Sequence, residues 1–129
     1  MFERLDISRE SYALATHAMT RQAAISANIA NADTPGYKAM DAGSFAEELA
    51  DRGGLQPLAT RPSHLARPDA EQRFELSARR IPGNSSPNGN TVSLESEMVN
   101  AADVRQTYDM ALAIAKSTSN ILRSSLGRR

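Results

Sequence analysis

The sequence contains no cysteine and no tryptophan, and its aromatic residues are three phenylalanines and three tyrosines. Without cysteine, a disulfide scaffold, an iron–sulfur cluster, a zinc site with thiolate ligands and a thiol nucleophile are all excluded. The 15 basic residues balance the 15 acidic residues, which argues against a strongly basic polymer binder and an acidic tail protein. No apolar run approaches the ~20 residues needed to cross a bilayer.

Glycine and proline are missing from both ends of the chain. The 7 glycines and 6 prolines are absent from residues 1–34 and 93–126, and all but Gly127 lie between Pro35 and Gly89. Compact domains usually spread such residues over many short connections. The distribution indicates one mainly all-α domain over 1–129. Its three parts are an N-terminal helix and turn (1–39), a loop-rich insert (40–92) and a C-terminal helix (93–129).

Residues 8–31 carry a helical period whose stripe is rich in small side chains, which favours close approach of a partner helix. Ser8 or Ser11 is expected to cap its start. Met1–Ile7 shows no clear periodicity and is expected to be loose unless a partner orders it. The stripe consists of Leu14, Ala15, Ala18, Met19, Gln22, Ile25, Ser26 and Ile29.

Residues 94–126 show a stronger pattern, a heptad seam with alternating spacings of four and three. Ser93 is the expected N-cap, Glu95 and Glu97 occupy the first turn, and Gly127 is expected to end the helix. The predicted seam consists of Leu94, Met98, Ala101, Arg105, Tyr108, Leu112, Ala115, Ser119, Leu122 and Leu126. Four further apolar residues widen the stripe, which suggests more than one neighbouring helix: Val104, Ala111, Ile114 and Ile121.

The insert contains signals for short elements only. Ser44 and Glu47 form a capping box that predicts a helix over about 44–51, ended by Gly53 and Gly54. Prolines, among them Pro62, Pro68, Pro82 and Pro87, then interrupt regular structure. Residues 72–77 alternate weakly and indicate a short strand, and the Asn88-Gly89 pair is suited to closing a hairpin.

The segment 27–39, ANIANADTPGYKA, reads as a helix end followed by a fixed turn. Thr34 precedes proline and is pushed into an extended conformation, so the helix must stop before it. Pro35 and Gly36 suit the central positions of a type II turn, in which the second residue has a positive φ. Tyr37 would then return toward the helix. The motif residues are Asn28, Asn31, Thr34, Pro35, Gly36 and Tyr37. On physical grounds alone, an ordinary helix stop explains them.

This segment strongly resembles the N-terminal signature of the bacterial flagellar axial proteins, the family of rod, hook and hook-associated subunits. The resemblance covers residues 1–41 and 91–129 well and the middle loosely, through the Thr60–Leu65 stretch TRPSHL. The short length is similar to that of a proximal rod protein, and a sister proximal rod protein is the alternative within the family. The resemblance implies a non-enzymatic structural subunit of the flagellar basal-body rod. Its terminal helices would pair as an antiparallel coiled coil and self-assemble to transmit torque.

The same resemblance implies partners and a location. The expected partners are copies of the chain, other rod proteins, the inner-membrane ring or adaptor of the basal body, and the flagellar type III export apparatus. The expected location is the rod in the periplasmic space. Export without a cleaved signal peptide is expected, since residues 1–6 carry charges and no apolar stretch follows.

The remaining candidates for chemistry are weak. His64 lies near Asp69 and Glu71 on a proline-rich loop without an orienting scaffold, so neither catalysis nor a metal site is expected. His17 is interpreted as a surface or interface imidazole. Thirteen of the basic residues are arginine, but they form no dense cluster with aromatic neighbours, so neither nucleic acid, a small-molecule substrate nor a cofactor is expected. The alternative of another class is a generic helical adaptor or nucleic-acid-binding module.

Overall fold

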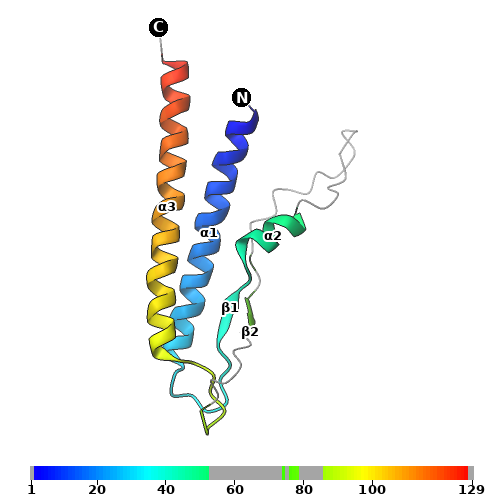
Figure 1. The fold of residues 1–129 in the computed structure, drawn as a ribbon, viewed down its shortest axis with the longest axis vertical. Helices are drawn as coiled ribbons and strands as arrows, with labels where there is room; N and C mark the ends of the chain where they lie inside the picture. The colour runs from blue at the N-terminus through cyan, green and yellow to red at the C-terminus, as the bar shows by residue number, and fades with distance from the viewer. Residues whose placement is uncertain (1, 53–73, 75, 79–85, 128–129) are drawn as a thin grey trace.

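The computed structural model describes residues 2–52, 74, 76–78 and 86–127. The elements run in the order α1 (Phe2–Ala30), β1 (Met40–Ala42), α2 (Phe45–Arg52), β2 (Leu76–Ala78) and α3 (Leu94–Leu126). Figure 1 shows α1 and α3 side by side and antiparallel, with both chain ends at the same end of the pair. No helix within the described ranges has the length and apolar character needed to cross a membrane. The predicted fold of two long terminal helices packed together is confirmed.

The first helix starts earlier than its periodic stripe suggested. Phe2–Ile7, which the sequence predicts to be loose unless a partner orders them, are helical in the structure and contain neither glycine nor proline. Ser8 and Ser11 therefore lie inside the helix, where the Ser11 hydroxyl donates to the Ser8 carbonyl at 2.8 Å. α1 ends at Ala30, beyond which Asn31 donates from both its backbone and its side chain to the Ala27 carbonyl.

The C-terminal helix has the bounds and caps that the sequence predicts. The Ser93 side chain accepts from the Ser96 N–H, and the Ser93 backbone is extended, as an N-cap requires. At the other end, the Gly127 N–H donates to the Arg123 carbonyl at 2.8 Å. Acidic residues in the first turn and Arg123 in the last both complement the helix dipole.

Small side chains make the contact between the two long helices. Ala18, Ile25 and Val104 form its buried centre, with Ala101 and Tyr108 packed against them. The buried stripe continues along α3 through further small residues, Ala111, Ala115 and Thr118. Because alanine contributes little apolar area per residue, this core is thin.

The face of α3 that meets α1 is rotated relative to the predicted seam. Leu94, Met98, Leu112 and Leu126 are 46%, 66%, 42% and 74% exposed, so within one chain their predicted place between the helices is wrong. The buried positions Glu97, Val104, Ala111 and Thr118 each lie one residue from a predicted seam position. The reason is size: the small residues on α1 allow the helices to approach closely where α3 is also small.

On the N-terminal helix, burial extends to a second face. Met19, Gln22, Ser26 and Ile29 of the predicted stripe are exposed. Residues outside the stripe are buried instead: Ser11, Ala13, His17, Ala24 and Asn28. β1 and the segment that leads to α2 lie along α1, as Figure 1 shows, and they account for this additional burial.

The insert contributes the short helix and one small sheet. α2 begins one residue after the predicted start, and the Ser44 carbonyl accepts from the Glu48 N–H at 3.1 Å. The predicted stop at 53–54 lies outside the described residues. β1 and β2 pair antiparallel, with Met40 opposite Ala78 and Ala42 opposite Leu76. β2 overlaps the predicted strand, but β1 was not predicted, and these strands are not joined through Asn88-Gly89 as a tight hairpin would be.

Candidate functional site

The motif at the end of α1 forms the turn that its sequence predicts. The Tyr37 N–H donates to the Thr34 carbonyl at 3.3 Å, and Gly36 has a φ of 72°. A bonded four-residue turn with positive φ at its third position is the arrangement of a type II turn. Before it, the Thr34 hydroxyl donates to Asn31 Oδ1 at 3.2 Å, which ties the turn to the last bonds of the helix.

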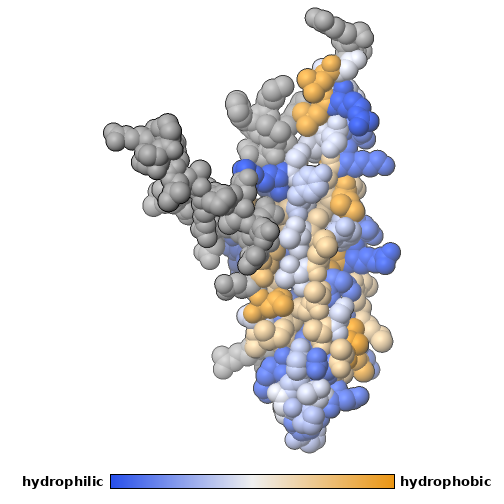
Figure 2. Space-filling model, turned by 180° about the vertical axis from the view of Figure 1, so that it is seen from behind, coloured by the Kyte–Doolittle hydropathy of each residue, from blue (hydrophilic) through white to orange (hydrophobic). Residues whose placement is uncertain are grey.

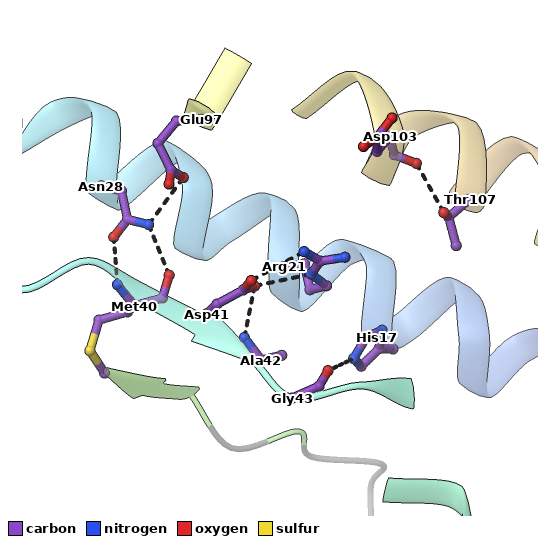
Figure 3. Close-up of polar contacts among 10 residues, drawn as sticks. All are labelled: His17, Arg21, Asn28, Met40, Asp41, Ala42, Gly43, Glu97, Asp103 and Thr107. Atoms are coloured by element: carbon purple, nitrogen blue, oxygen red, sulfur yellow. Dashed lines mark hydrogen bonds and ion pairs between the residues drawn. The ribbon is translucent and has the colours of Figure 1, made fainter. Parts of the chain in front are cut away.

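The turn returns the chain so that three groups converge on Asn28, which is fully buried. Asn28 Oδ1 accepts from the Met40 N–H at 2.9 Å and from the Tyr37 hydroxyl at 3.3 Å. Its Nδ2 donates to the Met40 carbonyl at 2.8 Å, as Figure 3 shows. One asparagine side chain thereby bonds both backbone polar groups of Met40 and holds β1 against α1.

The same amide also reaches the second long helix. Asn28 Nδ2 donates to Glu97 Oε2 at 3.1 Å, and the Glu97 side chain is 1% exposed (Figure 3). Buried carboxylates are rare unless they are hydrogen-bonded, because burial removes their hydration. This contact joins residues far apart in the sequence and ties the end of α1 to the first turn of α3.

A second segment, residues 86–91, completes the site. The Gly89 N–H donates to the Ser86 carbonyl at 2.8 Å and the Ser86 N–H donates to the Asn90 carbonyl at 2.9 Å. With Gly89 at a φ of 79°, these bonds define a tight three-residue turn of the bulged type. The Asn88-Gly89 pair therefore reverses the chain, although no strand flanks it among the described residues.

The side chain of Asn90 closes the end of the first helix. Its Nδ2 carries two hydrogens and lies within hydrogen-bond distance of the carbonyls of Asn31, Ala32 and Thr34, at 3.0, 2.7 and 2.8 Å. These carbonyls lie in the turn that follows α1, where the Asn31 and Thr34 carbonyls also accept from the Thr34 and Tyr37 N–H groups. Asn90 is 1% exposed and holds this turn from the far side of the insert.

Backbone bonds join the two segments directly. The Gly36 N–H donates to the Asn88 carbonyl at 2.9 Å and the Thr91 N–H donates to the Tyr37 carbonyl at 3.1 Å. The Thr91 hydroxyl in turn accepts from the Ala39 N–H at 2.9 Å. We call the side chains of Asn28, Tyr37, Asn90 and Glu97 the polar joint, since they connect α1, β1 and α3 at one end of the helix pair.

Two further side chains of α1 anchor the chain beyond β1. The Arg21 guanidinium forms a bidentate ion pair with Asp41, at 3.0 and 3.1 Å. His17 Nε2 donates to the Gly43 carbonyl at 2.9 Å, and its ring lies 4.9 Å from that of Phe74, nearly perpendicular to it. His17 is 4% exposed, so its interpretation as a surface imidazole is wrong: the aromatic residues of the insert cover it.

A cavity of about 400 Å³ lies beside these anchors, between α1, α3 and the start of α2. Its lining includes His17, Arg21, Asp41, Phe45, Val104 and Thr107. The imidazole, guanidinium and carboxylate in this lining already bond to the protein. In the described part of the chain, no three histidine, aspartate or glutamate side chains are grouped to hold a metal ion. His64 and the carboxylates near it lie outside that part.

Comparison with known proteins identifies the family. Over 127 residues, the chain is 35% identical to the flagellar basal body rod protein FlgB of Salmonella typhimurium, and the match covers 91% of each chain. The chain belongs to the FlgB family. Its members are structural, non-enzymatic proteins of the flagellar basal-body rod, and this chain is accordingly a proximal rod subunit.

Other FlgB proteins match over similar lengths. The FlgB of Escherichia coli is 37% identical over 121 residues, covering 81% of this chain and 83% of the relative. The FlgB of Agrobacterium fabrum is 27% identical over 113 residues, covering 84% and 83%. A family model described as "Flagella basal body rod protein" matches residues 15–38, which comprise the second half of α1 and the turn.

The predicted motif residues of this FlgB-family chain divide into two groups. Asn28 and Tyr37 meet in the polar joint, while Asn31, Thr34, Pro35 and Gly36 build the turn that brings Tyr37 back. The predicted helix-packing residues also divide. Buried or half-buried in the chain are Leu14, Ala18, Ile25, Tyr108, Ala115 and Leu122; exposed are Ile29, Leu94, Met98, Leu112 and Leu126.

The sequence reasoning missed Asn90 and the pairing of Glu97. Asn90 stands in a polar run that reads as a turn, and Glu97 reads as one of two first-turn carboxylates. The signal that separates Glu97 from Glu95 is its heptad spacing to Val104 and Ala111. That spacing places Glu97 on the buried stripe and leaves Glu95 in solvent.

Proposed function

We propose that the subunit assembles with copies of itself and with other rod proteins through the outward faces of α1 and α3. One observation carries this proposal. The contact within the chain uses small side chains, while the large apolar side chains of both helices remain exposed. Exposed apolar stretches of this extent mark interaction surfaces.

Figure 2 shows apolar groups along the length of the helix pair, alternating with charged ones. The exposed large side chains of the two helices are Ile7, Tyr12, Met19, Ile29, Leu94, Met98, Val99, Met110, Leu112, Ile114, Ile121 and Leu126. On α3 they occupy positions on several sides of the helix, which fits more than one neighbouring helix. Burial against neighbours would supply the apolar area that the thin core lacks.

The partners and route follow from the resemblance to axial proteins. The subunit would pass unprocessed through the flagellar type III export apparatus and join the rod in the periplasmic space. There it would contact the inner-membrane ring or its adaptor. In this role, the long unbroken helices would carry torque along the rod, and the polar joint would keep them together at one end.

Deletion and complementation test the proposal. A strain without the gene should not swim and should lack proximal rods, and the plasmid-borne gene should restore both. Isolated basal bodies from the complemented strain should contain the chain. A chain that stays soluble while swimming is normal would instead indicate a helical adaptor or a nucleic-acid-binding module.

A further inference from the structure

Few features of the contact between α1 and α3 fix its register. Val104, Ala111 and Thr118 recur every seven residues along the buried stripe and are all small or branched. Sliding one helix by a heptad, about 10.5 Å, would exchange such contacts for similar ones. The connection between Ala30 and Leu94 is long, but bonds between residues 31–39 and 88–91 hold the end of α1 near the start of α3.

Glu97 is the exception on this stripe. It is the charged member of the buried set on α3, and it faces Asn28, the last buried residue of α1. If the helices slid by a heptad, Asn28 and Glu97 would no longer meet, and their hydrogen bond would be lost. Burial of a carboxylate without its hydrogen bond is costly, whereas the apolar contacts barely change.

The surroundings of Asn28 determine which of its atoms faces Glu97. The Met40 N–H and the Tyr37 hydroxyl both require an acceptor, so Oδ1 must face them. Nδ2 is left to donate toward α3, where only an acceptor can receive it. The requirement for an acceptor at position 97 therefore follows from the turn motif.

We propose that the hydrogen bond between Asn28 and Glu97, together with the bonds between residues 31–39 and 88–91, sets the register of α3 against α1, with Glu97 as a positioning residue for assembly. Buried polar contacts are known to specify register in helix pairs at some cost in stability. The proposal rests on the proposed function, because the register decides which exposed side chains of the two helices lie beside each other on the outer surface.

The proposal is tested by exchanging the donor at position 28 and the acceptor at position 97. Asn28→Asp places two carboxylates together and should lower the number of rods per cell at least about 100-fold, as expected for breaking a buried charged contact. Adding Glu97→Gln places an amide donor opposite the introduced carboxylate. The pair then carries a single negative charge again, as it does in the wild type. The double variant should recover to within about tenfold of the wild type, since the Met40 carbonyl still lacks its donor.

Glu95 provides the matched control, because it lies in the same helical turn but is exposed. Glu95→Gln combined with Asn28→Asp removes the same charge and should not restore rods. Circular dichroism of the purified variants, at a concentration where the wild type is helical, gives a readout that does not require rods. Failure of the wild-type gene to complement a deletion overturns the proposed function alone. Absence of rescue by Glu97→Gln, or equal rescue by Glu95→Gln, overturns the assignment of register to this pair.

Discussion

Gly36 has a left-handed backbone conformation, and the space around it would accommodate a side chain. Its φ is 72°, and a Cβ added there would meet no other atom within 4 Å. The dihedral angle, rather than close packing, is what requires glycine. The requirement matters for assembly because the turn directs Tyr37 toward Asn28.

Substitution of Gly36 should therefore depend on backbone preference. Gly36→Val should destabilise the turn by about 1–2 kcal/mol, the cost of the left-handed region for an ordinary residue. Gly36→Asn should be milder, since asparagine enters that region more readily. Subunit secreted into the medium and rods in isolated basal bodies measure the effect: with valine, secreted subunit accumulates and rods are few. Equal severity of the two variants would contradict the role given to the dihedral.

Asn90 should be as sensitive as the motif residues. Asn90→Ala removes the donor of the Ala32 carbonyl and a second contact of the Asn31 and Thr34 carbonyls, and it should cost about 1–3 kcal/mol. Asn90→Asp should be worse, because a carboxylate would face those carbonyl oxygens. Swimming on soft agar compares these variants with Asn120→Ala, which changes an exposed asparagine of α3. Normal swimming of the Asn90→Asp strain would show that the helix end needs no such donor.

At the scale of elements, the sequence predicts the helix bounds and the turn, because residues close by in the chain determine them. The bounds of α3 follow from Ser93 and Gly127, and α2 begins within one residue of the start that the sequence predicts. The turn follows from Pro35 and Gly36 in the same way. None of these features needs information from distant parts of the chain.

What the sequence does not predict depends on distant partners. The buried face of α3 could not be chosen, because its stripe is wide and the choice depends on the small residues of α1. His17 is buried only because Phe45 and Phe74 arrive from the insert. Asn90 acquires its role only when residues 86–91 reach the end of α1.

Substitutions at two adjacent residues of α3 test the contact within the subunit and the proposed contact between subunits one at a time. Ala111 is fully buried, and Ala111→Asp should disrupt the helix pair itself, at a cost of several kcal/mol for a buried charge. Leu112 is 42% exposed, so Leu112→Asp should leave the pair intact but abolish incorporation into rods. Export should continue for Leu112→Asp if it depends on the N-terminus.

Cell fractionation distinguishes these outcomes, with Ser117→Asp as the control on an exposed position of the same helix. Secreted Leu112→Asp subunit that has the helix content of the wild type at the same concentration but forms no rods is the expected result. A motile Leu112→Asp strain would place the contact between subunits elsewhere on the helix.

At the scale of the whole molecule, a single chain buries too little apolar surface to hold two long helices firmly. Among the described residues, the largest fully buried side chains are Ile25, Glu97, Asn28 and Asn90, of which three are polar. Helices of this length draw most of their stability from packing. We expect the dilute monomer to be largely disordered at both ends and to become ordered on assembly. Hydrogen exchange on a dilute sample measures this, and strong amide protection across Leu94–Leu126 without a partner would contradict it.

The bonds between residues 36–39 and 88–91 close the insert at its base, close to where it leaves the first helix and enters the second. Because these bonds close the base, the length of the inserted segment should have little effect on how the two helices pack. For a flexible loop, doubling its length raises the closure free energy by only about 0.6 kcal/mol. A glycine–serine stretch added between Gly53 and Arg73 should accordingly leave rod assembly near normal, whereas the same stretch between Ala39 and Met40 should abolish it. Subunits of one rod-forming lineage can then differ widely in bulk while presenting the same helix pair to their neighbours.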